Sequence, residues 1–280
     1  HQEARRQRQM CIRDRCDVQS DPTLGQFLTV TNGNPSLDAE KSKSAHFGFV
    51  LQPRTGISVS ADFYRIRERN VVDANPQFIV NNNARSLLFA DAVTRDEMGN
   101  LSEIRATRLN IMRRDVSGWD LSGWYDLELA GRRFRLTANA TYIDTFREQF
   151  DPEAPVIEQA GTFMDDASSG NGALPRWKAN VGAAWSAGHW RGSYTVHYVA
   201  ALNEIVPIIE ARRRIASWRV HDLQLRYAGP FTRWADVSFG IDNLFDEPPP
   251  FAAAAFNDSY DARTYDITGR FVYFLSLIHI

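Results

Sequence analysis

The chain has 280 residues, of which 44% are hydrophobic, 12% aromatic and 24% charged, with a net charge of -2 and a sequence pI of about 6.3. This composition is typical of a folded chain, and it lacks the basic excess of a nucleic-acid-binding protein. A mean hydropathy of -0.37 and the lack of a long apolar run exclude a transmembrane helix. They do not exclude a transmembrane barrel, because barrel strands are polar at every second residue.

The two ends differ in character from the rest of the chain. Both cysteines, Cys11 and Cys16, lie in a basic leader without strand pattern, so the remaining residues offer no disulfide or cysteine-based metal site. The leader also lacks the apolar core of a signal peptide. We interpret residues 1–16 as a non-native leader and residues 276–280 as a non-native tail of a translated sequencing fragment. Residues 17–275 are then the native part.

Strict alternation of apolar and polar residues recurs along the chain, which predicts β-strands with two chemically different faces. Residues 17–45 are rich in Gly, Asn and Pro and are expected to form turns and loops. About nine strands follow, and we place them at residues 46–52, 57–71, 109–129, 134–142, 177–185, 194–200, 223–227, 235–242 and 265–274.

The connections between these strands alternate between short and long. Short turns are expected near residues 53–56, 130–132, 187–189 and 229–233, and long loops near 72–107, 146–174, 203–216 and 246–262. A bacterial outer-membrane barrel has this arrangement, with short periplasmic turns and longer extracellular loops. A soluble sandwich has no reason to gather its long loops at one end.

The apolar face of three predicted strands carries aromatic pairs eight residues apart: Phe134/Tyr142, Trp177/Trp185 and Tyr265/Tyr273. Eight residues span about 26 Å. At a tilt of about 40° this projects to about 20 Å, close to the apolar band between the aromatic girdles of a barrel. The opposite face is polar and suits a wet or plugged lumen; it includes Arg135, Asn139, Asp222, Gln224, Arg226, Asp236, Ser238 and Asp242.

Two strings near the end of the chain carry a family resemblance. Gly240, Asp242, Asn243, Leu244, Phe245 and Asp246 form the first, and Gly269 and Arg270, followed by aromatic residues, form the second. With weaker strings at residues 34–42 and 116–120, they resemble the C-terminal end of TonB-dependent outer-membrane receptors. The resemblance implies a barrel of about 22 strands with a plugged lumen and active uptake of large, scarce nutrients. Nothing in the chain resembles the family's plug domain or its TonB-contacting box.

The sequence therefore predicts an all-β chain, an antiparallel up-and-down transmembrane barrel segment of about nine C-terminal strands. The function expected from the resemblance is import of a siderophore, cobalamin or an oligosaccharide across the bacterial outer membrane, without catalysis or cofactor. The expected partners are the nutrient, TonB, outer-membrane lipid and lipopolysaccharide, and no nucleic acid. Two alternatives stay open: a soluble extracellular carbohydrate-binding or carbohydrate-hydrolysing module, and a passive porin-like channel.

Few residues suggest site chemistry of their own. The six histidines show no metal-ligand spacing, and we interpret His197 as a polar lumen residue. Asp165, Asp166 and Asn171 lack the order of a calcium loop and are read as a solvated loop. The run Arg212, Arg213 and Arg214 lies in a predicted extracellular loop and is a weak candidate for an anionic substrate or for lipopolysaccharide phosphates, against the simpler reading of a solvated charge run.

Overall fold

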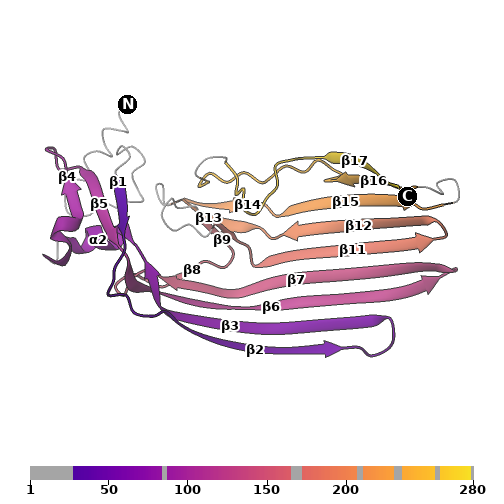
Figure 1. Cartoon of the computed structure of the whole chain (residues 1–280), viewed down its shortest axis with the longest axis horizontal. Coiled ribbons are helices and arrows are strands. Elements are labelled where there is room, and N and C mark those ends of the chain that lie inside the picture. Colours follow the sequence, from indigo (N-terminus) through magenta and orange to yellow (C-terminus); the bar gives the residue numbers. More distant parts are fainter. Residues whose placement is uncertain are drawn as a thin grey trace.

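Nine long antiparallel strands lie side by side in one open sheet (Figure 1). The computed structural model describes residues 28–83, 87–164, 172–206, 211–229, 235–255 and 259–278. Each long strand pairs with the next long strand along the chain, as in an up-and-down barrel wall. In sheet order from one edge they are β17 (Phe271–Ile278), β16 (Ala235–Asp242), β15 (Trp218–Tyr227), β12 (Trp190–Val199), β11 (Trp177–Ala187), β7 (Arg132–Gln149), β6 (Leu109–Leu129), β3 (Ile57–Asp73) and β2 (Lys41–Leu51).

The register of the ladders gathers the apolar residues on one face. Residues directly opposite each other on paired strands share a face. Aromatic residues follow one another across five strands, from the middle part of β2, β3, β6 and β7 to the loop end of β11: Phe47, Phe63, Trp119, Tyr142 and Trp177. We call this set the upper aromatic row. The Phe63 and Trp119 ring centroids are 5.2 Å apart, and those of Tyr142 and Trp177 are 4.7 Å apart.

A second set of aromatic residues lies toward the short turns on the same face. Phe134 pairs with Trp185, and Trp190 pairs with Tyr227, with ring centroids 4.8 Å apart in the latter pair. Between the two sets the face carries small and aliphatic residues, such as the paired Ala138 and Val181. Because no second layer of described residues covers this face and Val181 is 54% exposed, its apolar side chains suit a lipid environment.

The final strand differs from the prediction. It begins at Phe271, not at residue 265, and pairs with β16 as far as Ile278. Tyr273 is opposite Gly240, so it lies on the polar face and does not form an aromatic pair with Tyr265 on the apolar face. Tyr265 is instead 3% exposed in the preceding loop and packs edge-on against Trp218. The periodicity failed because residues 265–270 make turn contacts that interrupt the strand.

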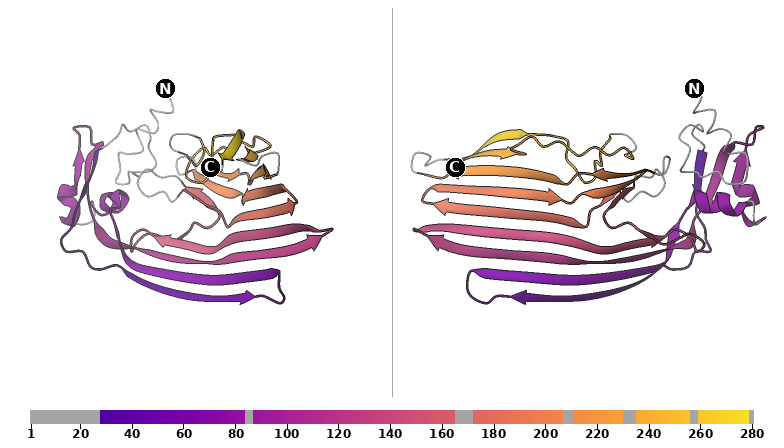
Figure 2. Two further views of the ribbon diagram at one scale, coloured as in Figure 1. Left: turned by 45° about the vertical axis from the view of Figure 1, so that its right-hand side comes forward. Right: turned by 180° about the vertical axis from the view of Figure 1, so that it is seen from behind.

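All four long loops leave the same end of the sheet, and the short turns lie at the other (Figures 1 and 2). This confirms the predicted alternation of the connections. The loop after β3, which the sequence predicts only as a long loop, is folded around Ile79, Val80, Ile104 and Ala106. Its elements are α2 (Pro76–Asn83), a 3-10 helix (Leu87–Ala92), β4 (Val93–Arg95) and β5 (Leu101–Thr107), and β5 pairs in parallel with β1 (Leu28–Asn32).

The start of α2 has a clear local cause. Asn75 caps the helix by accepting a hydrogen bond from the backbone N–H of Phe78 at 3.1 Å, and Pro76 occupies the first helical position. Both helical segments are short, and within the described ranges no helix could span a membrane.

The next two long loops pair with each other through a second small sheet. Its strands are β10 (Gly172–Leu174), β9 (Thr162–Met164), β13 (Leu202–Val206) and β14 (Ala211–Ile215), in that order, while β8 (Ile157–Glu158) adds to β7. The β9–β13 ladder is parallel and joins segments that belong to different hairpins of the main sheet. We call this sheet, together with residues 243–270, the loop cluster.

Candidate functional site

The polar face of the main sheet carries ordered side-chain pairs between neighbouring strands. Asp126 receives two hydrogen bonds from Arg135, from Nε and Nη2, both at 2.6 Å. Thr141 donates to Asp120 at 2.6 Å. These side chains are partly exposed, so screening limits what they add to stability. Their value is to hold a fixed array of donors and acceptors along the face.

His197 bridges three strands on this polar face. Its Nε2 is 2.9 Å from a carboxylate oxygen of Asp222, and its Nδ1 is 2.6 Å from the amide oxygen of Asn180. The other oxygen of Asp222 accepts the backbone N–H of Asn243 at 2.9 Å. The structure thus places His197 on the polar face, where the sequence analysis puts it.

A cavity of about 680 Å³ opens where the last loop overhangs this part of the face. Lys178, Asp222, Asp242 and Asp266 supply its charged groups and His197 adds an imidazole, while Thr264, Thr268, Gly269 and Phe271 of the last loop and the start of β17 complete the lining. The lining offers hydrogen-bond donors and acceptors of both charges and can hold a polar ligand group. In the part of the chain that the structure describes, no group of three or more His, Cys, Asp or Glu residues lies together as metal ligands.

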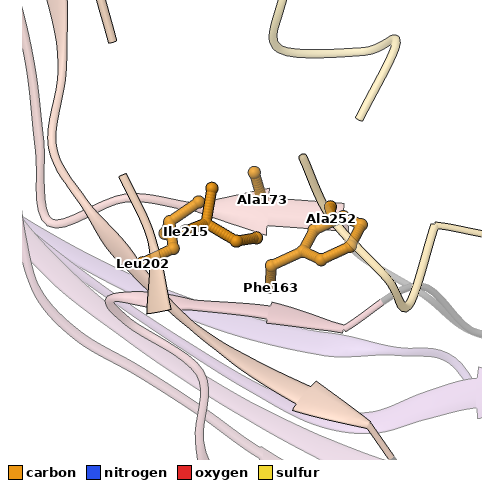
Figure 3. Close-up of a cluster of buried hydrophobic side chains, with 5 residues drawn as sticks. All are labelled: Phe163, Ala173, Leu202, Ile215 and Ala252. Atoms are coloured by element: carbon orange, nitrogen blue, oxygen red, sulfur yellow. The ribbon is translucent and has the colours of Figure 1, made fainter. Parts of the chain in front are cut away.

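The loop cluster has its own apolar core (Figure 3). Phe163 is fully buried, and Leu202 and Ile215 are each 1% exposed. Ala173 and Ala252 complete the group, so β9, β10, β13, β14 and the last loop all contribute. This packing fixes three long loops relative to one another.

A buried carboxylate ties the β13–β14 hairpin to the last loop. Glu204 is 1% exposed and accepts the backbone N–H of Ala254 at 2.6 Å. Arg213 approaches its second oxygen at 3.8 Å and places its guanidinium 5.1 Å from the ring centre of Phe251. A buried carboxylate needs such partners, because leaving it unpaired lowers the stability of the fold by roughly 3–5 kcal/mol.

Asp261 makes a second connection within the loop cluster. It is 4% exposed and accepts the backbone N–H of Ala173 at 3.0 Å. Burial raises its pKa, but hydrogen bonds from Ala173, Thr264 and Arg263 outweigh burial, so the pKa of Asp261 lies below its ordinary value. Burial, with the negative charge of Asp261, raises the pKa of Tyr265 to about 12. Both groups keep their usual charge at neutral pH.

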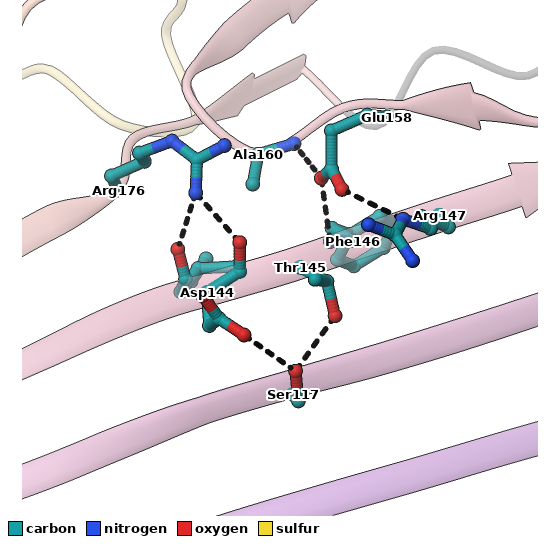
Figure 4. Close-up of polar contacts among 9 residues, drawn as sticks. Ser117, Asp144, Thr145, Phe146, Arg147, Glu158, Ala160 and Arg176 are labelled. Carbon is teal, nitrogen blue, oxygen red and sulfur yellow. Dashed lines mark hydrogen bonds and ion pairs between the residues drawn. The ribbon is translucent and has the colours of Figure 1, made fainter.

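The second long loop is anchored to the main sheet by a polar group (Figure 4). Glu158 accepts the backbone N–H groups of Phe146 and Ala160 at 2.8 and 3.0 Å, and Arg147 at 3.2 Å. Arg176 donates from Nη1 to the carbonyl oxygens of Ile143 and Asp144, at 3.3 and 2.6 Å. The guanidinium of Arg176 is therefore held against the backbone of β7, before the end of that strand at Gln149.

The two strings of the family resemblance meet in space. Asn243 and Asp246 have positive φ angles of 52° and 59°, and the side chain of Asn243 exchanges hydrogen bonds with the backbone of Glu247. Asp246 accepts the backbone N–H of Arg270 at 2.8 Å, which ties the end of β16 to the start of β17. Gly240 lies under the Tyr273 ring, which a Cβ atom there would overlap. Leu244 donates its backbone N–H to the carbonyl of His221, beside Phe245.

The arginine run does not act as one unit. Its residues pair with β13 in the order Ile205–Arg212, Glu204–Arg213 and Asn203–Arg214, so the neighbouring side chains of Arg213 and Arg214 point to opposite faces of this small sheet. The side chain of Arg212 lies outside what the structure describes, as do Asp165, Asp166 and Asn171. Sequence reasoning missed the contacts of Glu204, Asp261 and Arg176. One signal was present: the alternation within residues 202–206 and 211–215 places Arg213 on the opposite face from Arg214.

An open antiparallel sheet with one apolar, aromatic-bordered face, one polar face and all long loops at one end defines a transmembrane β-barrel wall. The family model described as "TonB dependent receptor-like, beta-barrel" matches residues 19–244. The chain belongs to the TonB-dependent receptor family, which is a family of transport receptors and not of enzymes. Its members with known structures that resemble this chain are outer-membrane proteins.

Solved structures of the same fold confirm the barrel assignment. A ferric enterobactin receptor mutant from Pseudomonas aeruginosa has a TM-score of 0.56 at 18% identity, covering 88% of this chain and 32% of its own. The FrpB iron transporter from Neisseria meningitidis has a TM-score of 0.54 at 11% identity, covering 89% and 31%. The copper transporter OprC has a TM-score of 0.51 at 17% identity, covering 87% and 33%. The chain thus spans about a third of their length. Among curated proteins, none matches.

Proposed function

We propose that this chain is the C-terminal nine-strand part of an outer-membrane barrel that imports a large, scarce nutrient. The observation that carries the proposal is the combination of family membership with the polar face beneath the loop cluster. In this proposal the loop cluster meets the nutrient first, and the polar face with His197 and Asp222 forms part of its path through the barrel.

The energy for import comes, in this proposal, from an inner-membrane complex acting through TonB, because that coupling defines the family. The nutrient is a siderophore, cobalamin or an oligosaccharide. Structural neighbours named for ferric enterobactin, iron and copper transport make a metal or metal chelate the first class to test. Lipid and lipopolysaccharide of the outer membrane surround the apolar face. Residues 17–275 are proposed as the native part and residues 1–16 and 276–280 as non-native, although residues 276–278 extend the β17 ladder with β16.

The test uses the full-length receptor that carries this segment, expressed in a strain without other receptors. Uptake of a radiolabelled ferric siderophore, cobalamin and a maltooligosaccharide is measured with TonB present and deleted, after the receptor has been located by membrane fractionation. We expect outer-membrane location and TonB-dependent uptake of one probe. Uptake that persists without TonB would establish a passive channel, and soluble receptor would overturn the membrane assignment.

A matched pair of variants separates the polar face from the sheet's stability. Asp222→Asn removes a charge from the cavity wall while keeping an oxygen for the Asn243 N–H. Asp126→Asn removes a charge from the same face near the short turns, outside this cavity. We expect Asp222→Asn to weaken uptake about tenfold and Asp126→Asn to leave it within about twofold, since an effect of one kcal/mol or more needs a contact with the ligand.

A further inference from the structure

A second cavity, of about 550 Å³, lies on the opposite side of the sheet from the proposed nutrient path. Three arginines line it: Arg176, Arg214 and Arg219. Arg219 pairs across the ladder with Tyr198, and both belong to the apolar face of the sheet. The guanidinium of Arg219 is 5.6 Å from the centre of the Tyr198 ring. The cavity therefore faces the surroundings of the barrel and not its lumen.

The depth of this cavity follows from the upper aromatic row. Arg176 directly precedes Trp177, the last residue of that row, and lies on its loop side. Aromatic rows of outer-membrane barrels mark the boundary between the acyl chains and the headgroups. Arg219 begins lower, because it pairs with Tyr198, which in turn pairs with Ala179, two residues on the bilayer side of Trp177. Arginine extends its guanidinium from an apolar stem toward water, and Arg219 lines the same cavity as Arg176 and Arg214. The cavity thus opens at the headgroup level on the side of the long loops, which is the extracellular side.

The three arginines of this cavity keep charge and hydrogen-bond donors that contacts within the chain do not satisfy. No carboxylate of the described residues forms an ion pair with Arg176, Arg214 or Arg219. Arg176 donates from Nη1 to two carbonyl oxygens. A guanidinium has five N–H donors, so other N–H groups of Arg176 can donate to a ligand. Asn203 and Ser217 add polar side chains to the same lining. Arg213, which points the other way, is paired with buried Glu204.

We propose that this cavity binds the phosphate group of an outer-leaflet lipid headgroup, such as that of lipopolysaccharide. Arginine forks match the oxygens of a phosphate, and the positive charge of three guanidinium groups more than compensates the charge of a phosphate dianion. Arg176 is held by β7, Arg219 by β15 and Arg214 by the loop cluster, so a bound phosphate bridges the sheet and the loops. The inference rests on the proposed outer-membrane location.

The test compares full-length receptors in detergent by native mass spectrometry, with bis-phosphorylated lipid A and its dephosphorylated analogue as probes. The variant Arg214→Gln/Arg219→Gln removes two guanidiniums from the cavity. Its control, Arg133→Gln/Arg191→Gln, removes the same charge from the polar face near the short turns. We expect the first variant to bind phosphorylated lipid A about 30-fold more weakly, since one basic residue near an anionic surface contributes about fivefold. The control is expected to bind it as the parent does.

Equal binding of phosphorylated lipid A by the parent and Arg214→Gln/Arg219→Gln would overturn the proposal. So would equally tight binding of the dephosphorylated analogue, or an equal loss in the control. Nutrient uptake and membrane fractionation in the same strains keep the two proposals apart. A parent receptor that does not reach the outer membrane refutes the proposed function. One that reaches it and imports nutrient, with lipid binding unaffected by the substitutions, refutes the lipid site alone.

Discussion

Gly118 lies where the ladder between β6 and β7 changes register. Ser117 pairs with Thr145 and Gly118 with Ile143, so β7 contributes one extra residue at this point. A Cβ atom on Gly118 would overlap the backbone oxygen of Tyr142 and the Tyr64 hydroxyl. Backbone cannot move aside as a side-chain tip can. The glycine therefore allows the bulge that brings Trp119 opposite Tyr142 in the upper aromatic row.

Replacing Gly118 with Ala is expected to destabilise the barrel by about 2 kcal/mol, because the added methyl group forces the two strands apart. The measurement is the urea midpoint for unfolding of the full-length receptor in detergent. Gly123→Ala is the control on the same strand, since its nearest neighbour would be the Ser58 carbonyl oxygen at 3.3 Å. If both variants unfold at the parent's midpoint, the bulge does not require glycine.

Asp261 makes the loop cluster sensitive to acid. Its pKa is lowered in the folded state, so its contribution to stability is fully present above its unfolded pKa and is lost as pH falls through the folded pKa. Asp261→Asn keeps the shape but weakens hydrogen bonds to a charged acceptor, which contribute roughly 2 kcal/mol. We expect the variant's loop cluster to be cut by protease faster than the parent's at pH 7.

The same comparison at acid pH supplies the check. Below the folded pKa, Asp261 is protonated in the parent as well, so the cutting rates of parent and variant should converge there, measured with an acid-active protease such as pepsin. A constant ratio of rates across the pH range would show that the charge of Asp261 does not stabilise the loop cluster.

At the scale of elements, alternation predicted the strands best where both faces have one environment throughout. Strand β11 is such a case, with Trp177 to Trp185 outward and Lys178 to Ser186 on the polar face. Strand β17 was predicted less well. Asp266 accepts the backbone N–H of Thr268 at 2.8 Å and forms a turn just before the strand, and an alternating pattern does not reveal such a turn. The family strings around Asn243 and Gly269 were visible, but their contact across 24 residues needs the folded loop.

The loop elements were the least predictable part. Their strands have two to seven residues, and their apolar positions pack within the first long loop or, in the loop cluster, against other loops. Phe163 looked like one residue in a polar loop, yet it is fully buried in the loop cluster. No local period reports a contact between Phe163 and Ala252, which lie far apart in the chain.

Phe163→Ala is expected to unfold the loop cluster while leaving the barrel strands intact. Removing a buried phenylalanine costs about 3–5 kcal/mol, and the cavity it leaves touches three loops. Limited proteolysis should then cut residues 150–176 and 200–217 together, with an unchanged β-sheet circular dichroism spectrum. Val156→Ala in the same loop is the control, because Val156 is 60% exposed. Equal resistance of both variants would show that Phe163 does not hold the loops.

At the scale of the molecule, the main sheet is open. Among the described residues, β2 pairs only with β3 along one side and β17 only with β16, so both edges carry unpaired backbone groups. In lipid each such group costs several kcal/mol, roughly, which is why barrels close. The nine-strand count and the orientation of the loops were readable from the sequence. The diameter of a barrel grows with its number of strands, so nine strands cannot close a barrel as wide as the family implies.

The 280-residue chain alone, refolded in detergent, is expected to give mixed oligomers and no channel activity. The measurement is size-exclusion chromatography with light scattering, followed by single-channel conductance in a planar bilayer. Chain refolded together with the remaining strands of its receptor is the control and should give one closed species. A single monomeric pore from the chain by itself would contradict this expectation.

The parallel β9–β13 ladder has a consequence for motion. It joins backbone of two loops that rise from different hairpins, and their shared core includes Ala252 of a third. Segments locked in this way open as one cooperative unit, so their amide protons exchange with solvent at one common rate. We therefore expect a ligand that binds to one of these loops to slow amide exchange in all three.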